Sequence, residues 1–368
     1  MIKVLLVSTN GDEAGVPRHV ESIIHLLKKE VDFSCIFGDY GPVSNRLIEE
    51  LGEKVSILKG IKSSLNFLKD FFIFFKFCYL VFKINPDLIH CHSAKAGIYG
   101  RVLSIITRKK VLLTIHGWPW RGFSGWKFKL IVLVEKLLMK FSRCSYIGVA
   151  NCLMREASKE GLKISKKNFS VIYNSSNLKN SRLPIKGFIN KDYKYFLMPA
   201  RVSNSKDHLT LAKAFDLSNF KGKLIFAGEG TKSVNFKNFI NSSMQNKKDD
   251  LIFLGQRSDI YSLMHKAEFI ALCSNFETFP LIIPEAGSIS KPLILSKVGG
   301  NQEILKNRHD ALFASTLSEW IEAINFYCKP HNLKKVSDNL ALTYEAKLSP
   351  RNAKKALLFT YSKIKNLK

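Results

Sequence analysis

Short hydrophobic runs alternate with longer segments of helical periodicity along the whole chain. The runs Val4–Ser8, Val111–Ile115 and Tyr195–Pro199 are each about as long as one strand and almost entirely apolar. Such strands are typical of parallel sheets that are buried between two layers of helices. The pattern pauses in a polar stretch at 180–192 and then restarts. We therefore predict two α/β domains in succession.

The order of these segments also predicts where a ligand binds. Open parallel sheets bind ligands at the carboxyl ends of their strands, so two such domains predict a ligand between them. We place the first domain at residues 1–180, the second at 181–347 and a C-terminal helical segment at 348–368.

The charge of the chain is large and unevenly distributed. The 368 residues have a formal net charge of +27. Residues 54–155 hold 18 basic and 3 acidic side chains, whereas residues 1–53 hold 5 basic and 9 acidic ones. A basic segment suits nucleic acid, an anionic membrane surface or a phosphorylated substrate. The basic runs lack the interleaved aromatics of a known nucleic-acid-binding pattern, so we expect no nucleic-acid partner.

Cysteine usage and the N-terminus indicate the compartment. None of the seven cysteines forms a Cys-x-x-Cys pair, which disfavours a zinc or redox motif and suits a reducing cytosol. The N-terminal apolar run is too short for a secretory signal. The only membrane-span candidate, Leu65–Ile84, contains Lys69, Asp70, Lys76 and Lys83, so a spanning helix is disfavoured. We expect a cytoplasmic protein.

The lysines of this stretch recur with a regular spacing. Lys62, Lys69, Lys76 and Lys83 are seven residues apart, which keeps them on one helical face. One interpretation is a helix packed on the sheet with a thin solvated edge. The other is an interfacial helix that holds the first domain on an anionic leaflet, with its phenylalanines shared between core and bilayer.

Four charged residues of the second half suit a nucleotide-sugar. Glu277 follows a predicted strand and Glu285 lies at the start of the next helix. Carboxylates accept hydrogen bonds from sugar hydroxyls, and free N–H groups at a helix start suit phosphate. Arg201 and Lys206 follow another strand and can offset a diphosphate charge without metal. Taken singly, each could also be an ordinary surface charge.

The first half offers a glycine loop and several histidines. Gly15 lies between a strand and a helix, where backbone can approach a diphosphate or acceptor, although the Gly-x-Gly-x-x-Gly fingerprint is absent. His116 ends a strand and can reach a ligand as a hydrogen-bonding group. His90 and His92 look like a zinc pair, but no third ligand follows at a convincing spacing, which favours structural histidines.

The segment from Glu277 to Ala286, with Lys291–Ile294 and Gly299–Glu303 after it, resembles the signature of retaining family 4 glycosyltransferases. Matching pieces occur in both halves, so the resemblance covers nearly the whole chain. It implies the GT-B fold, α/β, with two Rossmann-like domains facing across a central cleft. The first domain would bind the acceptor and the second the donor, and the C-terminal helix would return to the first.

The resemblance also implies an activity. The enzyme would transfer a sugar, with retention, from a nucleotide-diphosphate sugar (a UDP-sugar foremost) to a hydroxyl of a lipid-linked oligosaccharide or polysaccharide acceptor. No cofactor and no divalent metal would be needed, and the chain has no Asp-x-Asp motif. The setting would be O-antigen or capsule assembly at the inner face of the cytoplasmic membrane. A GT-B nucleotide-sugar epimerase and a non-catalytic basic binding protein are the alternatives.

Individual roles follow from the same resemblance. Glu277 and His116 would act at the donor sugar as catalytic residues, and Glu285 would bind the ribose. The donor contacts are expected at Gly15, Arg201, Lys206, Gly228, Thr278, Phe279, Pro280, Leu281 and Glu285. The acceptor and membrane side is expected at Arg18, Lys69, Lys76, Lys95 and Trp118. Trp118 could equally be core packing. Val16 and Pro280 stand where the family often has glycine, and Pro280 has no N–H to donate.

Overall fold

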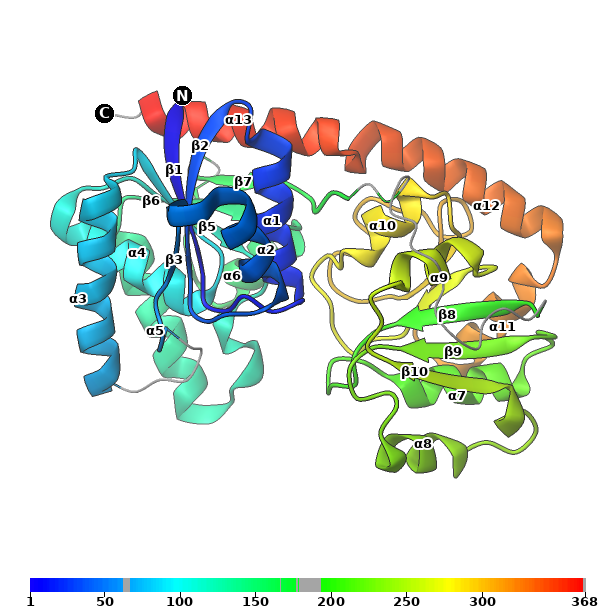
Figure 1. Ribbon diagram of the computed structural model, residues 1–368. Coiled ribbons are helices and arrows are strands. Elements are labelled where there is room, and N and C mark those ends of the chain that lie inside the picture. Colours follow the sequence, from blue (N-terminus) through cyan, green and yellow to red (C-terminus); the bar gives the residue numbers. More distant parts are fainter. Residues whose placement is uncertain (62–66, 166, 177, 179–192, 367–368) are drawn as a thin grey trace. The chain divides into compact units, whose positions relative to one another are not determined.

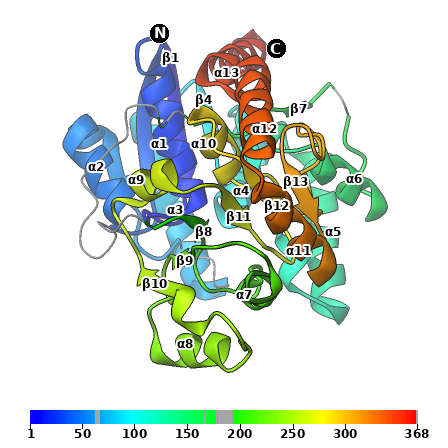
Figure 2. The same cartoon turned by 90° about the vertical axis from the view of Figure 1, so that its right-hand side faces the viewer.

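The structure is a computed structural model that describes residues 1–61, 67–165, 167–176, 178 and 193–366. The chain forms two compact units, Met1–Asn174 with Ala353–Lys368, and Ser175–Asn352 (Figures 1 and 2). The boundary between the first and second units lies after Asn174, a few residues before the predicted boundary at 180. Ser176 already belongs to the second unit, where its carbonyl accepts a hydrogen bond from the Tyr344 hydroxyl. The predicted polar linker at 180–192 lies outside the described residues.

The first unit is built on a parallel sheet. Its described strands follow the order β3-β2-β1-β4-β5-β6-β7. They are β1 (Ile2–Ser8), β2 (Val31–Phe37), β3 (Val55–Ile57), β4 (Leu88–Cys91), β5 (Val111–Ile115), β6 (Cys144–Gly148) and β7 (Phe169–Val171). The last five residues of β1 and all of β4 and β5 are buried, which explains their continuous apolar runs.

Helices connect these strands and cover the sheet (Figure 1). They are α1 (Gly15–Leu27), α2 (Pro42–Leu51), α3 (Phe67–Ile84), α4 (Ala94–Thr107), α5 (Gly125–Phe141) and α6 (Cys152–Lys159), with α13 (Pro350–Asn366) from the end of the chain. Ion pairs join three of them. Lys95 of α4 pairs with Asp70 of α3 at 2.5 Å, and Arg101 of α4 pairs with Glu135 of α5 at 2.6 Å. Helix α4 therefore lies between α3 and α5.

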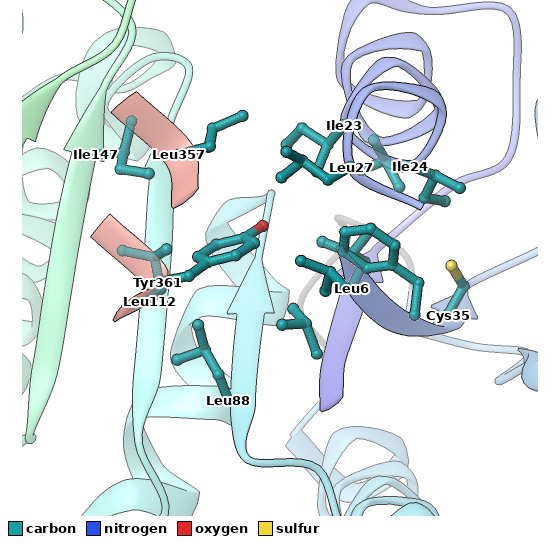
Figure 3. Close-up of a cluster of buried hydrophobic side chains, with 14 of the residues drawn as sticks. Leu6, Ile23, Ile24, Leu27, Cys35, Leu88, Leu112, Ile147, Leu357 and Tyr361 are labelled. Carbon is teal, nitrogen blue, oxygen red and sulfur yellow. The ribbon is translucent and has the colours of Figure 1, made fainter. Parts of the chain in front are cut away.

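The C-terminal segment, expected to return to the first domain, contributes to its core. Leu357 and Tyr361 of α13 are buried with Ile23 of α1, Leu6 of β1 and Leu88 of β4 (Figure 3). The hydroxyl of Tyr361 also lies 2.8 Å from a ring nitrogen of a buried histidine. The first unit thus needs both ends of the chain to complete its core.

The second unit repeats the architecture. Its described strands follow the order β10-β9-β8-β11-β12-β13. They are β8 (Tyr195–Pro199), β9 (Lys223–Ala227), β10 (Leu251–Gly255), β11 (Ile270–Leu272), β12 (Leu293–Ser296) and β13 (Leu312–Ala314). The helices are α7 (His208–Leu217), α8 (Val234–Asn241), α9 (Ile260–Lys266), α10 (Ile282–Ser288), α11 (Leu317–Tyr327) and α12 (Pro330–Thr343). Phe196 and Phe269 stack at 4.6 Å in its core.

Candidate functional site

Three neighbouring strands of the second unit, β8, β11 and β12, end at the same edge of the sheet. Their loops are held together by hydrogen bonds. The Asp207 amide donates to the Cys273 carbonyl at 3.0 Å, and the Asn275 amide donates to the Ser205 carbonyl at 2.9 Å. The Ser274 amide donates to Ser296 Oγ at 2.8 Å. Two sequence segments about 70 positions apart thus form one polar surface.

A charged cluster lies on this surface. The Lys206 ammonium forms an ion pair with Glu277 Oε1, and Ser274 Oγ donates to the same oxygen at 2.9 Å. The side chains of Lys206 and Glu277 are 16% and 13% exposed. A pair that is mostly shielded from water interacts more strongly than a surface pair. The cluster therefore has fixed charges that remain partly open to a ligand.

A glycine turn after β12 lies directly against the backbone of Glu277. Gly299 has φ +57°, and a Cβ built on it would lie 1.7 Å from the Glu277 carbonyl oxygen. The next amide, of Gly300, donates to the Thr278 carbonyl at 2.8 Å. Only glycine allows backbone to approach this closely at a positive φ. The turn belongs to the Gly299–Glu303 segment of the family motif, and the structure gives its local role.

The other donor residues predicted in the second half gather at the same edge. Glu285 is buried in α10, Thr278 and Phe279 are buried just before it, and Pro280 and Leu281 are half-buried between them. Arg201 is exposed in the loop after β8. The amide of the residue after it, Val202, donates to the Glu229 carbonyl at 2.9 Å, beside the predicted Gly228. The structure thus brings the predicted donor residues of this half together.

In the first unit, the predicted residues divide between strand ends and helix surfaces. Gly15 is the first residue of α1, and Arg18 lies one turn further, with its Nε 3.9 Å from Glu13 Oε1. His116 follows β5 and is half-buried, and its ring lies 5.0 Å from that of His19. The sequence does not indicate His19, because one histidine in a helix has no motif without its spatial neighbours.

Two residues predicted on the acceptor and membrane side lie in the interior. Trp118 is 4% exposed, stacks on Trp120 at 4.5 Å and donates through Nε1 to the Leu153 carbonyl. Lys95 is 6% exposed and pairs with Asp70. These contacts all lie within the first unit. Of the two interpretations of Trp118, the structure therefore favours core packing.

Comparisons with known proteins show the family to which the chain belongs. The Glycosyltransferase Family 4 description matches residues 14–179, and Glycosyl transferases group 1 matches residues 180–337. The two together cover both halves of the chain. The chain is a group 1 glycosyltransferase. The alternatives of an epimerase and a basic binding protein are set aside by this membership.

The glycosyltransferase is similar to curated bacterial enzymes over most of its length. It is 27% identical to the Escherichia coli UDP-Gal:alpha-D-GlcNAc-diphosphoundecaprenol alpha-1,3-galactosyltransferase, covering 84% of this chain and 83% of that one. It is 26% identical to the Campylobacter jejuni N,N'-diacetylbacillosaminyl-diphospho-undecaprenol alpha-1,3-N-acetylgalactosaminyltransferase, covering 80% and 81%.

A solved structure shares the fold. HepE from Anabaena, in complex with UDP-glucose, superposes with a TM-score of 0.82 at 18% identity, covering 98% of this chain and 100% of that one. The glycosyltransferase thus has the predicted GT-B class of fold, with two parallel-sheet α/β domains.

The glycosyltransferase also exposes apolar side chains on α3, to an extent that the sequence predicts only in part. On α3, Lys69, Lys76 and Lys83 are exposed, as predicted for a single helical face. The same face exposes large apolar side chains, namely Leu68, Phe71, Phe72, Phe75, Tyr79 and Phe82. The thin solvated edge of the first interpretation is therefore wrong, because most of the aromatic side chains that it places in the core face solvent.

Helix α5 exposes a second set of apolar and basic side chains. They are Trp126, Leu130, Leu133, Leu137 and Phe141, together with Lys127, Lys129, Lys136 and Lys140. Ile105 and Ile106 at the end of α4 are exposed as well. The acidic residue of α3, Asp70, and that of α5, Glu135, are both engaged with α4. We call the exposed residues of α3, α5 and the α4 end the apolar-basic face.

Proposed function

We propose that this glycosyltransferase moves a sugar from a nucleotide-diphosphate sugar to a hydroxyl of a lipid-linked or polysaccharide acceptor, in bacterial surface-polysaccharide assembly. The observation that carries the proposal is the Lys206–Glu277–Ser274 cluster at the carboxyl edge of the second sheet. A nearby cation suits a diphosphate, and a carboxylate suits sugar hydroxyls. Both bacterial enzymes compared above are named for an acceptor sugar on diphosphoundecaprenol, which supports a lipid-linked acceptor.

Each residue has a proposed role. Lys206 and Arg201 offset the charge of the donor diphosphate, which strengthens as the sugar leaves. Glu277 accepts hydrogen bonds from the donor sugar, and Glu285 accepts them from the ribose. The Lys206–Glu277 pair keeps both side chains at the site before the donor binds, which lowers the entropy lost on binding.

We propose that transfer retains the anomeric configuration. A bond forms between the acceptor oxygen and the anomeric carbon, and the bond from that carbon to the diphosphate breaks. The leaving diphosphate takes the acceptor proton, and no residue of the chain forms a covalent intermediate. Because Lys206 and Arg201 carry the compensating charge, the reaction needs no divalent metal. Coupling constants of the product's anomeric proton test retention, and activity that is lost in EDTA would contradict metal independence.

A donor-binding experiment tests the site. UDP-, GDP- and dTDP-sugars are titrated against the wild type, Lys206→Gln, Glu285→Gln and a control, Lys223→Gln. Lys223 is also an ion-paired lysine of this unit, but it begins β9 and so lies at the opposite edge of the sheet. We expect Lys206→Gln to weaken the best donor by about 30-fold or more, the loss typical of a charged partner. Equal donor affinities for all four proteins would contradict the site.

We also propose that the enzyme binds an anionic bilayer through the apolar-basic face. The described part of the chain holds no helix that is long and apolar enough to span a bilayer. Groups of exposed apolar side chains indicate a binding surface, and lysines beside them suit anionic headgroups at about 1 kcal/mol each. A bilayer surface is where a lipid-linked acceptor would be found.

Tryptophan fluorescence tests this contact directly. Of the four tryptophans, Trp126 is 71% exposed, whereas Trp118, Trp120 and Trp320 are buried. We expect the emission to shift to shorter wavelength on anionic vesicles, and the shift to vanish in Trp126→Phe.

Flotation with the same vesicles distinguishes binding through the apolar-basic face from attraction by the net charge of the protein. We expect Lys69/Lys76/Lys83→Glu to lose binding. The control Lys248/Lys334/Lys335→Glu changes three exposed lysines of the second unit and gives the same net charge. Equal loss in both variants, or no loss in the first, would contradict the proposed contact.

A further inference from the structure

Three histidines from three separate elements of the first unit meet at one place. His19 comes from α1, His92 from the end of β4 and His116 from the end of β5. One ring nitrogen of each can be chosen so that the three nitrogens lie within 4.8 Å of one another. The ring centroids are 5.0 to 5.8 Å apart. The inner histidine of the sequence pair, His90, lies outside this group of three.

The hydrogen-bond partners of these rings differ sharply. His90 uses both nitrogens, with the Tyr361 hydroxyl at 2.8 Å and Thr114 Oγ1 at 2.7 Å. His92 is fully buried, yet within the described residues neither of its ring nitrogens has a hydrogen-bond partner, and the same holds for Nε2 of His116. Each such buried group costs about 1–3 kcal/mol, so a ligand that contacts them is favoured.

The chemistry of three imidazoles suits a transition-metal ion. A neutral imidazole has one ring nitrogen with a lone pair to donate. Neutral imidazole is a ligand for transition metals, whereas Mg²⁺ and Ca²⁺ prefer oxygen.

We propose that His19, His92 and His116 bind one divalent transition-metal ion, with zinc as the ion best suited to three imidazoles. Tetrahedral zinc at 2.0–2.1 Å from nitrogen requires ligand nitrogens about 3.4 Å apart. The present separations, up to 4.8 Å, exceed this distance, so we expect the side chains to rotate towards the ion when it binds. His92 and His116 also line a cavity of about 220 Å³, which leaves room for water as the fourth ligand.

The proposed ion is an inhibitor, not a cofactor. This step rests on the proposed function and on the role that the family resemblance implies for His116 at the donor sugar, because an ion bound to His116 removes that nitrogen from the reaction. The diphosphate charge is offset in the other unit by Lys206 and Arg201, so the ion has no part in transfer. Zinc is therefore expected to lower the transfer rate.

Metal titration of the full chain tests the site. The metal-free protein is titrated with Zn²⁺ against a chromophoric chelator, and with Co²⁺ by visible absorption. We expect one equivalent of tight binding and a cobalt spectrum without a thiolate charge-transfer band, which separates the site from the free cysteines. Loss of one ligand, in His19→Ala or His92→Gln, is expected to weaken binding by about 100-fold or more, at least the effect of removing an outer-shell partner.

The control is His25→Ala. His25 lies on the same helix as His19, but its exposed ring pairs with Glu50 at 2.8 Å, away from the three rings. His19→Ala is the decisive variant if His92→Gln does not fold, because the His19 ring is only half-buried. No stoichiometric binding, or binding that survives His19→Ala as it survives His25→Ala, would overturn the site.

Transfer assays with and without zinc separate the two proposals. Zinc binding with no inhibition leaves the metal site standing and contradicts the role of His116 in transfer. Transfer without any zinc binding leaves the proposed function standing and overturns the metal site. Inhibition that EDTA reverses, and that is absent in His19→Ala, is the result expected if both are correct.

Discussion

Gly299→Ala adds one methyl group at a position where the structure leaves no room for it. The added Cβ would lie 1.7 Å from the Glu277 carbonyl oxygen, whereas carbon and oxygen in contact stay beyond about 3 Å. The backbone of Glu277 must therefore move by more than about 1 Å. A shift of this size in a substrate-positioning group costs about 100-fold in rate. We expect kcat/KM to fall by that factor, about 2.7 kcal/mol of transition-state stabilisation.

Stability should fall as well. Alanine at φ +57° by itself costs about 1–2 kcal/mol, because its Cβ approaches the carbonyl oxygen that follows it, and the displaced Glu277 backbone adds to this cost. For a unit of this size the φ strain alone corresponds to a melting temperature lower by about 2–8 °C. Activity and melting are measured on the same sample, so that loss of activity in a folded protein is distinguished from loss of the fold.

Gly122→Ala is the matched control. Among the described residues, no heavy atom lies within 4 Å of a Cβ built there. We expect wild-type activity and an unchanged melting temperature. If Gly299→Ala binds the donor and turns over within twofold of the wild type, then the turn after β12 does not hold Glu277 in a productive position, and the proposed role of Glu277 is wrong.

Three further predictions concern the first unit and acid stability. Arg101→Met or Glu135→Gln should each cost about 3–5 kcal/mol in urea unfolding, because the partner stays buried and unpaired, and the double change to Met and Leu should recover most of it. Tyr361→Phe should cost about 1–3 kcal/mol, since a buried imidazole loses its partner. Burial lowers the pKa values of His19 and His208 from 6.5 to about 4, so the unfolded chain binds more protons between these values. Stability should therefore fall as pH drops from 6.5 towards 4, and equal urea midpoints at pH 7.5 and 5 would contradict this.

The donor residues of the second half could be found from the sequence because they are local. Glu277 and Glu285 lie in one strand–loop–helix segment, and Lys206 follows a strand whose apolar run is plain. Hydrophobic periodicity places such segments at strand ends, and parallel strands align their carboxyl ends. The sequence could not supply the direct Lys206–Glu277 pair, which depends on β8 and β11 being neighbours in the sheet.

Helix α4 shows what the sequence does not reveal. Lys95 is expected from the family resemblance on the acceptor and membrane side, and Arg101 belongs to no motif. In the structure both cations are buried, because Asp70 and Glu135 reach them from the helices on either side. A charge can be buried when it is paired, and the pairing residues lie on other elements.

The sequence by itself determined the class of fold, the family motif and the basic character of residues 54–155, because each of these is written in neighbouring positions. Only the tertiary structure decided which side chains are buried and which meet. It exposes the phenylalanines of α3 and the apolar side chains of α5, and it brings His19, His92 and His116 together from three elements. The physical reason is that sheet order and helix packing fix distances between distant residues, and no local periodicity encodes those distances.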